Sequence, residues 1–170
     1  MKGQRAYKRF EGLLQELRKS FELSVTEEVK ETEGDFERYL IFLLGTEAFA
    51  LPITQLREVL SEREVIPVPY SPPSVHGVIN CRNRILSVTN IHNLLQIMFK
   101  KKDAPFLLVT RSSKFEKALL VDGLIGLVAI NQSEIKPKVS GQNESVDRLI
   151  TGEIYHQEKL VTLLDLMEVG

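Results

Sequence analysis

The stretch from Tyr39 to Leu44 carries an apolar side chain at every position. If it forms a β-strand, both of its faces are apolar, and such a strand must be covered on both sides. The stretch is far shorter than the roughly 20 apolar residues that a membrane-spanning helix needs. It therefore predicts a buried strand in a layered, soluble β protein.

Short apolar runs separated by turn residues continue along the rest of the chain. Runs of this length, bounded by Gly, Pro, Asn or Asp, indicate strands. The predicted extended segments are 38–44, 48–51, 56–60, 66–69, 77–80, 84–88, 106–110, 117–121, 124–130, 148–155 and 159–163. Segment 56–60 also fits a short helix that runs into a strand. The strands fall into two clusters, before and after residues 100–103, so we expect an all-β fold of two small barrels that share a core.

Several residues between these runs predict particular turns. Asp122-Gly123 predicts a tight hairpin, because such a turn needs a positive φ. Asn90 is expected to cap a short helix, and Ser71 to cap a single helical turn with Pro72 at its first position. The polar stretch 131–147 is expected to be a long loop, and 164–169 to close the chain with a helical turn.

Residues 1–35 differ from the rest of the chain. Apolar side chains recur there at spacings of three and four, which predicts one stripe on an amphipathic helix; they are Tyr7, Phe10, Leu14, Leu17 and Phe21. The stretch 27–35 is acidic with few apolar residues and is typical of a linker. The helix packs either on its own domain or on a partner or second copy. We therefore divide the chain into an N-terminal extension, 1–35, and a folded domain, 36–169.

Composition and charge exclude several classes of protein. The 170 residues include 22 Lys and Arg and 23 Asp and Glu, a net charge of −1 that does not support nucleic-acid binding. The single cysteine, Cys81, excludes a disulfide framework and indicates a reducing compartment. The three histidines show no metal-binding spacing. We expect a cytoplasmic protein without a signal peptide, cofactor, metal or direct membrane insertion, and no motif for catalysis is present.

Two charged residues stand out because their surroundings are apolar. Glu58 and Arg82 each lie in an apolar strand or turn, where a charge without a partner is costly. They either face each other or are two independent surface charges. Apolar residues gather in the same part of the chain; they are Ile53, Leu56, Val59, Val78, Leu86 and Val88. Where such residues line an exposed groove, they form a protein-docking site that suits an amphipathic helix.

These segments together resemble the CheW-like family. The stretch 36–49 is similar to the opening strand, turn and aromatic residue of that family, and 56–60 to its next strand. The stretches 66–69 and 75–82 are similar to its most characteristic region. Val121-Asp122-Gly123 and the ending 160–166 also fit, so the resemblance covers about residues 36–169.

The resemblance implies a fold and a function. CheW-like proteins have two intertwined SH3-like five-stranded β-barrels and no catalytic activity. They connect the cytoplasmic tip of a chemoreceptor to the regulatory domain of a CheA-type histidine kinase. By this resemblance Glu58 and Arg82 match an acid–base pair that sets the family's conformation. The resemblance also places five residues in the partner-binding groove: Ile53, Leu56, Glu58, Val78 and Arg82.

The sequence departs from the family's pattern after Arg82. Asn83 replaces a glycine, which is expected to alter the turn. Ser87 replaces a proline, and Asn90-Ile91-His92 replaces Asp-Leu-Arg. These changes motivate one alternative, a degenerate module that binds only the kinase or only the receptor. A second alternative is a β-barrel enzyme that uses Cys81 together with a histidine brought near it in space.

Overall fold

The computed structural model describes residues 36–61, 63–98, 106–111, 116–138 and 143–166, together with Gly12, Gln15 and Lys19. The chain divides into two units, Met1–Gly34 and Asp35–Gly170. Gly12, Gln15 and Lys19 are helical, and the rest of the predicted helix and linker lies outside the described residues. No helix among the described residues is both long and apolar enough to cross a bilayer.

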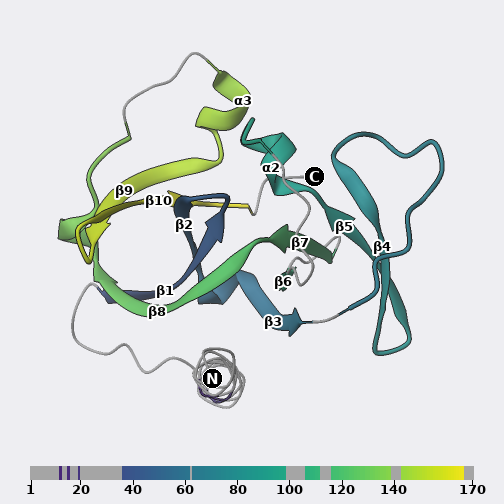
Figure 1. Ribbon diagram of the computed structural model, residues 1–170. Helices are drawn as coiled ribbons and strands as arrows, with labels where there is room; N and C mark the ends of the chain where they lie inside the picture. Colours follow the sequence, from purple (N-terminus) through teal and green to yellow (C-terminus); the bar gives the residue numbers. More distant parts are fainter. Residues whose placement is uncertain are drawn as a thin grey trace, which may run out of the picture. The chain divides into compact units, whose positions relative to one another are not determined.

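The second unit is built from strands, as expected (Figure 1). The strands are β1 Phe36–Leu44, β2 Glu47–Pro52, β3 Leu56–Ser61, β4 Val75–Cys81, β5 Arg84–Thr89, β6 Phe106–Thr110, β7 Lys117–Val121, β8 Gly123–Asn131, β9 Ile150–His156 and β10 Lys159–Leu164. The short helices are η1 Ile53–Gln55, α2 Ile91–Leu94, η2 Gln132–Glu134 and α3 Glu144–Asp147. Segment 56–60 is therefore a strand, and the helical alternative is wrong. The polar stretch 131–147 includes η2 and α3.

The ten strands form two five-stranded sheets that exchange strands between the two halves of the chain. Barrel A has the order β8-β1-β2-β10-β9, and barrel B has the order β3-β6-β7-β5-β4. Each strand of the first half, β1 to β5, corresponds to the strand numbered five higher in the second half. Replacing every strand by its counterpart converts the order of barrel A into the order of barrel B. Each half supplies two strands to one barrel and three to the other. The predicted architecture of two intertwined five-stranded barrels is confirmed.

The equivalence of the halves extends to details outside the strands. In barrel B, Ile66 forms an isolated bridge with Val78 of β4, and in barrel A, Lys136 forms one with Glu153 of β9. The residue before each bridged strand position is a glycine, Gly77 or Gly152. A Cβ at Gly77 would lie 2.5 Å from the carbonyl oxygen of Ile66, so only glycine allows this close approach.

The core has three layers because the central strands are buried on both faces. Tyr39 and Ile41 of β1 belong to the interior of barrel A. Leu40 and Phe42 alternate with them and are also fully buried. On β6 and β7 the pattern repeats: one set of side chains fills barrel B, and the alternate set is buried on the outer face. Since β1 contacts β7, these outer faces form a third layer between the barrels. The prediction of a strand covered on both sides is confirmed.

The predicted hairpin at Asp122-Gly123 is wrong, because β7 and β8 belong to different sheets. The chain crosses here from barrel B to barrel A, and Gly123 does not have a positive φ. The buried Asp122 carboxylate accepts a hydrogen bond from the backbone N–H of Gly45, 2.5 Å away, and lies 2.9 Å from His92 Nε2. The backbone N–H of Asp122 donates to the Leu43 carbonyl. β7 pairs with β5 and β6, and β8 pairs with β1, so each strand has its partners in its own barrel.

The smaller turn predictions had mixed outcomes. Asn90 caps α2 as expected, since its side chain accepts a hydrogen bond from His92 N. The helical turn predicted from Ser71 does not form; instead Val75 N donates to the Pro72 carbonyl in a simple turn. Residues 165–166 are not helical, and 167–169 lie outside the described residues. Asn83 adopts a φ of +63°, so it takes the left-handed conformation that a glycine would otherwise provide.

Strand exchange makes each half dependent on the other. We expect residues 1–102 and 103–170, expressed separately, to be insoluble or unfolded, because the both-face apolar strands of each half lack their covering strands. Expressed together, the two fragments should co-purify and melt cooperatively. Size-exclusion chromatography and circular dichroism measure this. A single fragment that is folded and monomeric would contradict the exchange.

Loss of the Asp122 carboxylate should weaken the crossover. Asp122→Ala leaves buried donors without their acceptor, so we expect the free energy of unfolding to fall by about 2–4 kcal/mol. Urea unfolding at pH 7 measures the change. The matched control is Glu134→Ala, which removes an exposed carboxylate on η2 and should change stability by less than about 0.5 kcal/mol. Equal effects of the two substitutions would show that Asp122 does not hold the crossover.

Candidate functional site

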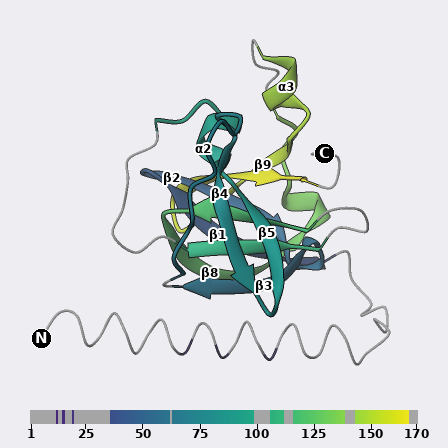
Figure 2. The same ribbon diagram turned by 90° about the vertical axis from the view of Figure 1, so that its right-hand side faces the viewer.

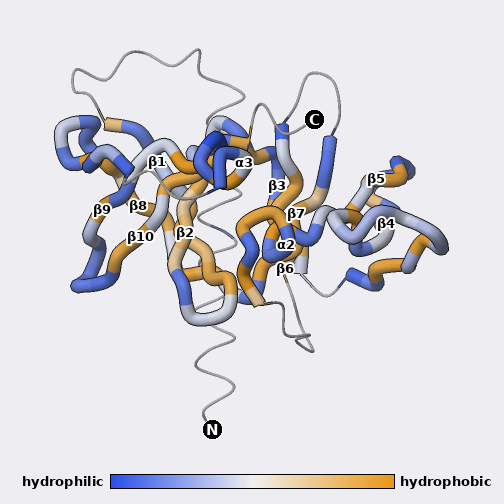
Figure 3. The backbone as a smooth tube through the Cα atoms, turned by 90° about the horizontal axis from the view of Figure 1, so that it is seen from above, coloured by the Kyte–Doolittle hydropathy of each residue, from blue (hydrophilic) through white to orange (hydrophobic). Residues whose placement is uncertain are grey.

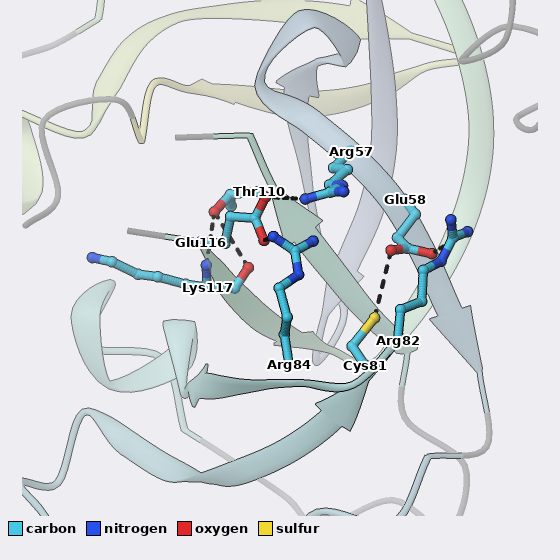
Figure 4. Close-up of polar contacts among 8 residues, drawn as sticks. All are labelled: Arg57, Glu58, Cys81, Arg82, Arg84, Thr110, Glu116 and Lys117. Atoms are coloured by element: carbon cyan, nitrogen blue, oxygen red, sulfur yellow. Dashed lines mark hydrogen bonds and ion pairs between the residues drawn. The ribbon is translucent and has the colours of Figure 1, made fainter. Parts of the chain in front are cut away.

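Six charged or polar residues gather at one end of barrel B, and we call this end the mouth (Figure 4). They come from β3, from the β4–β5 hairpin and from the residue before β7: Arg57, Glu58, Cys81, Arg82, Arg84 and Glu116. A bulge in β3 helps to assemble them. Leu56 pairs with Thr110 and Glu58 pairs with Val109, which leaves Arg57 as the extra residue. A bulge of this kind redirects side chains at a sheet edge.

Glu58 and Arg82 meet at the mouth, with Arg82 Nη2 3.1 Å from Glu58 Oε2. The Glu58 side chain is 17% exposed, so the argument from the cost of burying a charge applies to it. The Arg82 side chain is 74% exposed, and that argument does not apply to it. Arg82 lies in the two-residue turn between β4 and β5, where both it and Asn83 have positive φ. The turn thus carries the guanidinium across to β3.

A second ionic group lies beside the first and had no signal in the sequence. Glu116 pairs through Oε1 with Arg57, and its Oε2 lies 2.8 Å from Arg84 Nη1. Three separate segments of the chain meet in this way, and only the strand order brings them together. A charged residue just before a strand carries no local sign of such partners.

The two groups link the edges of barrel B. β3 and β4 are the two ends of the sheet order, so neither has the other as a ladder partner. Side chains span this gap instead: Glu58 of β3 reaches Arg82 and Cys81, and Arg57 of β3 reaches Glu116 and through it Arg84. Beneath them lies the apolar interior of barrel B, which includes Cys81. The mouth therefore covers one end of this core with charged groups.

The other predicted groove residues differ in how far their side chains are exposed. Leu56 is wrong as a contact residue, because its side chain is fully buried and cannot reach a partner. Ile53 lies in η1 and is half-buried. Val78 is half-buried on the outer face of β4, opposite to the face from which Ile79 enters the core. The placement of the five residues in one partner-binding groove stays a prediction.

Two exposed apolar surfaces lie on the outer faces of the equivalent hairpins, and of their residues only Val78 was predicted from the sequence. On barrel B, Ile66 is 57% and Ile85 is 69% exposed, with Val78 beside Ile66. Figure 2 brings this β4–β5 hairpin to the front. On barrel A, Tyr155 and Leu160 are paired across β9 and β10 and are also exposed. The sequence shows that the two faces of each strand alternate along the chain. It does not show which of the two faces is exposed.

The barrel A surface also carries a cation, because Lys136 Nζ lies 5.1 Å from the centre of the Tyr155 ring. Such a position over an aromatic face is attractive and holds the lysine stem against the ring. The tips of both hairpins are hydrophilic, and hydrophobic stretches run along the strands behind them (Figure 3). Each outer face is therefore an apolar area bordered by polar groups, as protein-docking surfaces commonly are.

The described residues give little support to catalysis at Cys81. Its thiol is buried and donates to Glu58 Oε1 over 3.5 Å. Burial, followed by the Glu58 charge, raises the pKa of this thiol. A reactive cysteine instead needs a lowered pKa. Within the part of the chain that the structure describes, no three His, Cys, Asp or Glu residues could together hold a metal ion.

Comparison with known proteins gives a consistent relationship. The CheW-like domain family matches residues 38–169. The chain is 26% identical over 130 residues to the chemotaxis protein CheW of Thermotoga maritima, covering 76% of this chain and 85% of that protein. It is 24% identical to the CheW of Helicobacter pylori, covering 82% and 85%. The crystal structure of the scaffolding protein TtCheW from Thermoanaerobacter tengcongensis superposes with a TM-score of 0.68 at 21% identity, over 77% of this chain and 90% of that one.

The raised pKa of Cys81 makes a prediction about its reactivity. Because thiolate is the reactive form, iodoacetamide should modify native Cys81 at pH 8 about tenfold or more slowly than it modifies the urea-unfolded protein. Mass spectrometry measures the rate. The control is Ser145→Cys in a Cys81→Ser background, which places a thiol at an exposed site. Native Cys81 reacting as fast as this control would favour the enzyme alternative.

Proposed function

Since the chain belongs to the CheW-like family, we propose that it is a non-catalytic scaffold that couples a chemoreceptor to a CheA-type histidine kinase. The observation that carries the proposal is the pair of exposed apolar surfaces on the β4–β5 and β9–β10 hairpins. A coupling protein must bind two macromolecules at once, and this needs two separate surfaces. It works in the cytoplasm, where the receptor tip and the kinase regulatory domain meet.

The barrel B surface is proposed to include Val78, Glu58 and Arg82, together with the exposed Ile66 and Ile85. Arginine is enriched in binding hot spots, and an exposed apolar patch beside it is a mark of an interaction site. Leu56 supports this surface from within the core. Ile53 remains a proposed contact at the edge of η1.

The departures from the family's pattern are compatible with two-partner binding. Asn83 keeps the left-handed turn, Asn90 keeps the cap of α2, and His92 contacts Asp122 at the crossover. Asn83, Asn90 and His92 thus each have a local structural role in the fold that carries the two surfaces. The one-partner module is the alternative outcome of the test below.

Binding to both partners tests the proposal. Beads carrying this chain should retain a CheA-type regulatory domain and a chemoreceptor cytoplasmic tip from the same organism, and each should remain bound in the presence of the other. Retention of only one supports the degenerate module. Retention of neither by a chain with an intact circular dichroism spectrum rejects the proposal.

A charge-reversal cycle tests the role of the ionic pair in that binding. Arg82→Glu should weaken binding, and adding Glu58→Arg should restore part of it. For a pair this exposed we expect a coupling of about 0.2–1 kcal/mol, up to roughly fivefold in Kd. Arg148→Glu, an exposed arginine at the end of α3, is the control and should bind normally. If the effects of Arg82→Glu and Glu58→Arg on the binding free energy simply add, the two side chains do not act as a pair in binding.

A further inference from the structure

Positive charge is concentrated at the mouth. Arg57, Arg82 and Arg84 share two carboxylates there, those of Glu58 and Glu116. The backbones of two further cationic residues lie at the same end. Arg111 N donates to the Gln55 carbonyl, and Lys117 N donates to Thr110 Oγ1.

This concentration is not a property of the domain as a whole. Residues 36–170 contain 15 Lys and Arg and 15 Asp and Glu, so their formal charge is zero. Three of these cations and two of the carboxylates form the ion pairs of the mouth, which gives this group a formal charge of +1 and the other residues of 36–170 a formal charge of −1. A charge separation of this kind orients an approaching charged partner.

The guanidinium groups at the mouth are accessible to a partner. The side chains of Arg57, Arg84 and Arg82 are 37%, 45% and 74% exposed. Glu58 and Glu116 are only 17% and 19% exposed, so the carboxylates lie beneath the arginines. Each guanidinium has five N–H donors in a planar fork that matches a carboxylate. The internal pairs leave the outer side of this arrangement positively charged.

The surroundings favour a protein segment over a nucleic acid or a membrane. A long polyanion needs a broad basic face, and here the rest of the domain is net negative. Ile85 follows Arg84 in β5 and is 69% exposed, but it lies on the opposite face of the strand and is not part of the mouth. We propose that the mouth binds a short acidic segment of a partner protein, with carboxylates that pair with the exposed guanidinium groups. The inference rests on the proposed function, because Glu58 and Arg82 belong to the proposed barrel B surface.

A defined peptide tests this inference. A fluorescent 12-residue peptide of four Glu-Glu-Leu repeats is titrated with the full chain, and anisotropy is read at about 0.05 M and 0.5 M salt. The matched peptide has four Gln-Gln-Leu repeats. The acidic peptide should bind more tightly than its neutral match, and high salt should remove most of the difference, since exposed charges are screened at that ionic strength.

Substitutions at the mouth test whether the acidic peptide binds there. Arg84→Gln combined with Arg82→Gln should weaken the acidic peptide by about fivefold to twentyfold, from two lost exposed charge contacts. Arg148→Gln is the control on α3 and should leave Kd unchanged. Thermal melting of each variant verifies that the fold is intact. Ile85→Ser changes the opposite face of β5 and should leave the difference between the two peptides unchanged.

Other outcomes overturn the inference. Equal binding of the two peptides, or equal effects of the mouth and control variants, would show that the mouth does not select carboxylates. Tighter binding of anionic phosphatidylserine vesicles or of a single-stranded oligonucleotide than of the peptide would assign the charge to a different partner. If the peptide fails while the receptor tip and kinase domain are retained, the inference falls and the proposed function stands. If the chain binds neither the peptide nor the receptor tip nor the kinase domain, both the inference and the proposed function are rejected.

Discussion

The carboxylate of Asp122 holds the point at which the chain passes from one barrel to the other. It accepts from Gly45 in the β1–β2 turn and contacts His92 in α2, so it joins elements of both barrels in a buried site. An Asp-Gly sequence between two apolar strands usually favours a hairpin, whereas here β7 and β8 lie in different sheets. Strand exchange, the shared core layer and the positions of both hairpins depend on this crossover.

The exchange explains how one short chain presents two comparable surfaces of different chemistry. The β4–β5 and β9–β10 hairpins occupy equivalent positions in the two strand orders, and each has an outward face. One face is aliphatic, whereas the other combines Tyr155 and Leu160 with the cation of Lys136. A scaffold that distinguishes two partners needs this combination of similar geometry and different side chains, because specificity is a difference between affinities.

The mouth of barrel B shows how the ends of a sheet can be joined without backbone hydrogen bonds. Ionic side chains cross from β3 to the β4–β5 hairpin and to Glu116. Exposed ion pairs of this kind contribute little stability, so a partner's carboxylate can compete for the arginines at small cost to the fold. The same residues can therefore close the barrel and take part in binding, which a ladder of backbone hydrogen bonds could not do.

The sequence by itself determined the features that depend on neighbouring residues: nearly all strand positions, the apolar character of Tyr39–Leu44 on both faces, and the Asn90 cap. The resemblance carried by its motifs also indicated the intertwined barrels. Only the tertiary structure decided that Leu56 is buried, that Asp122-Gly123 is a crossover, and that Glu116 joins Arg57 to Arg84. Backbone propensity and periodicity are local, whereas strand partners and ion pairs are set by segments that are far apart in the chain.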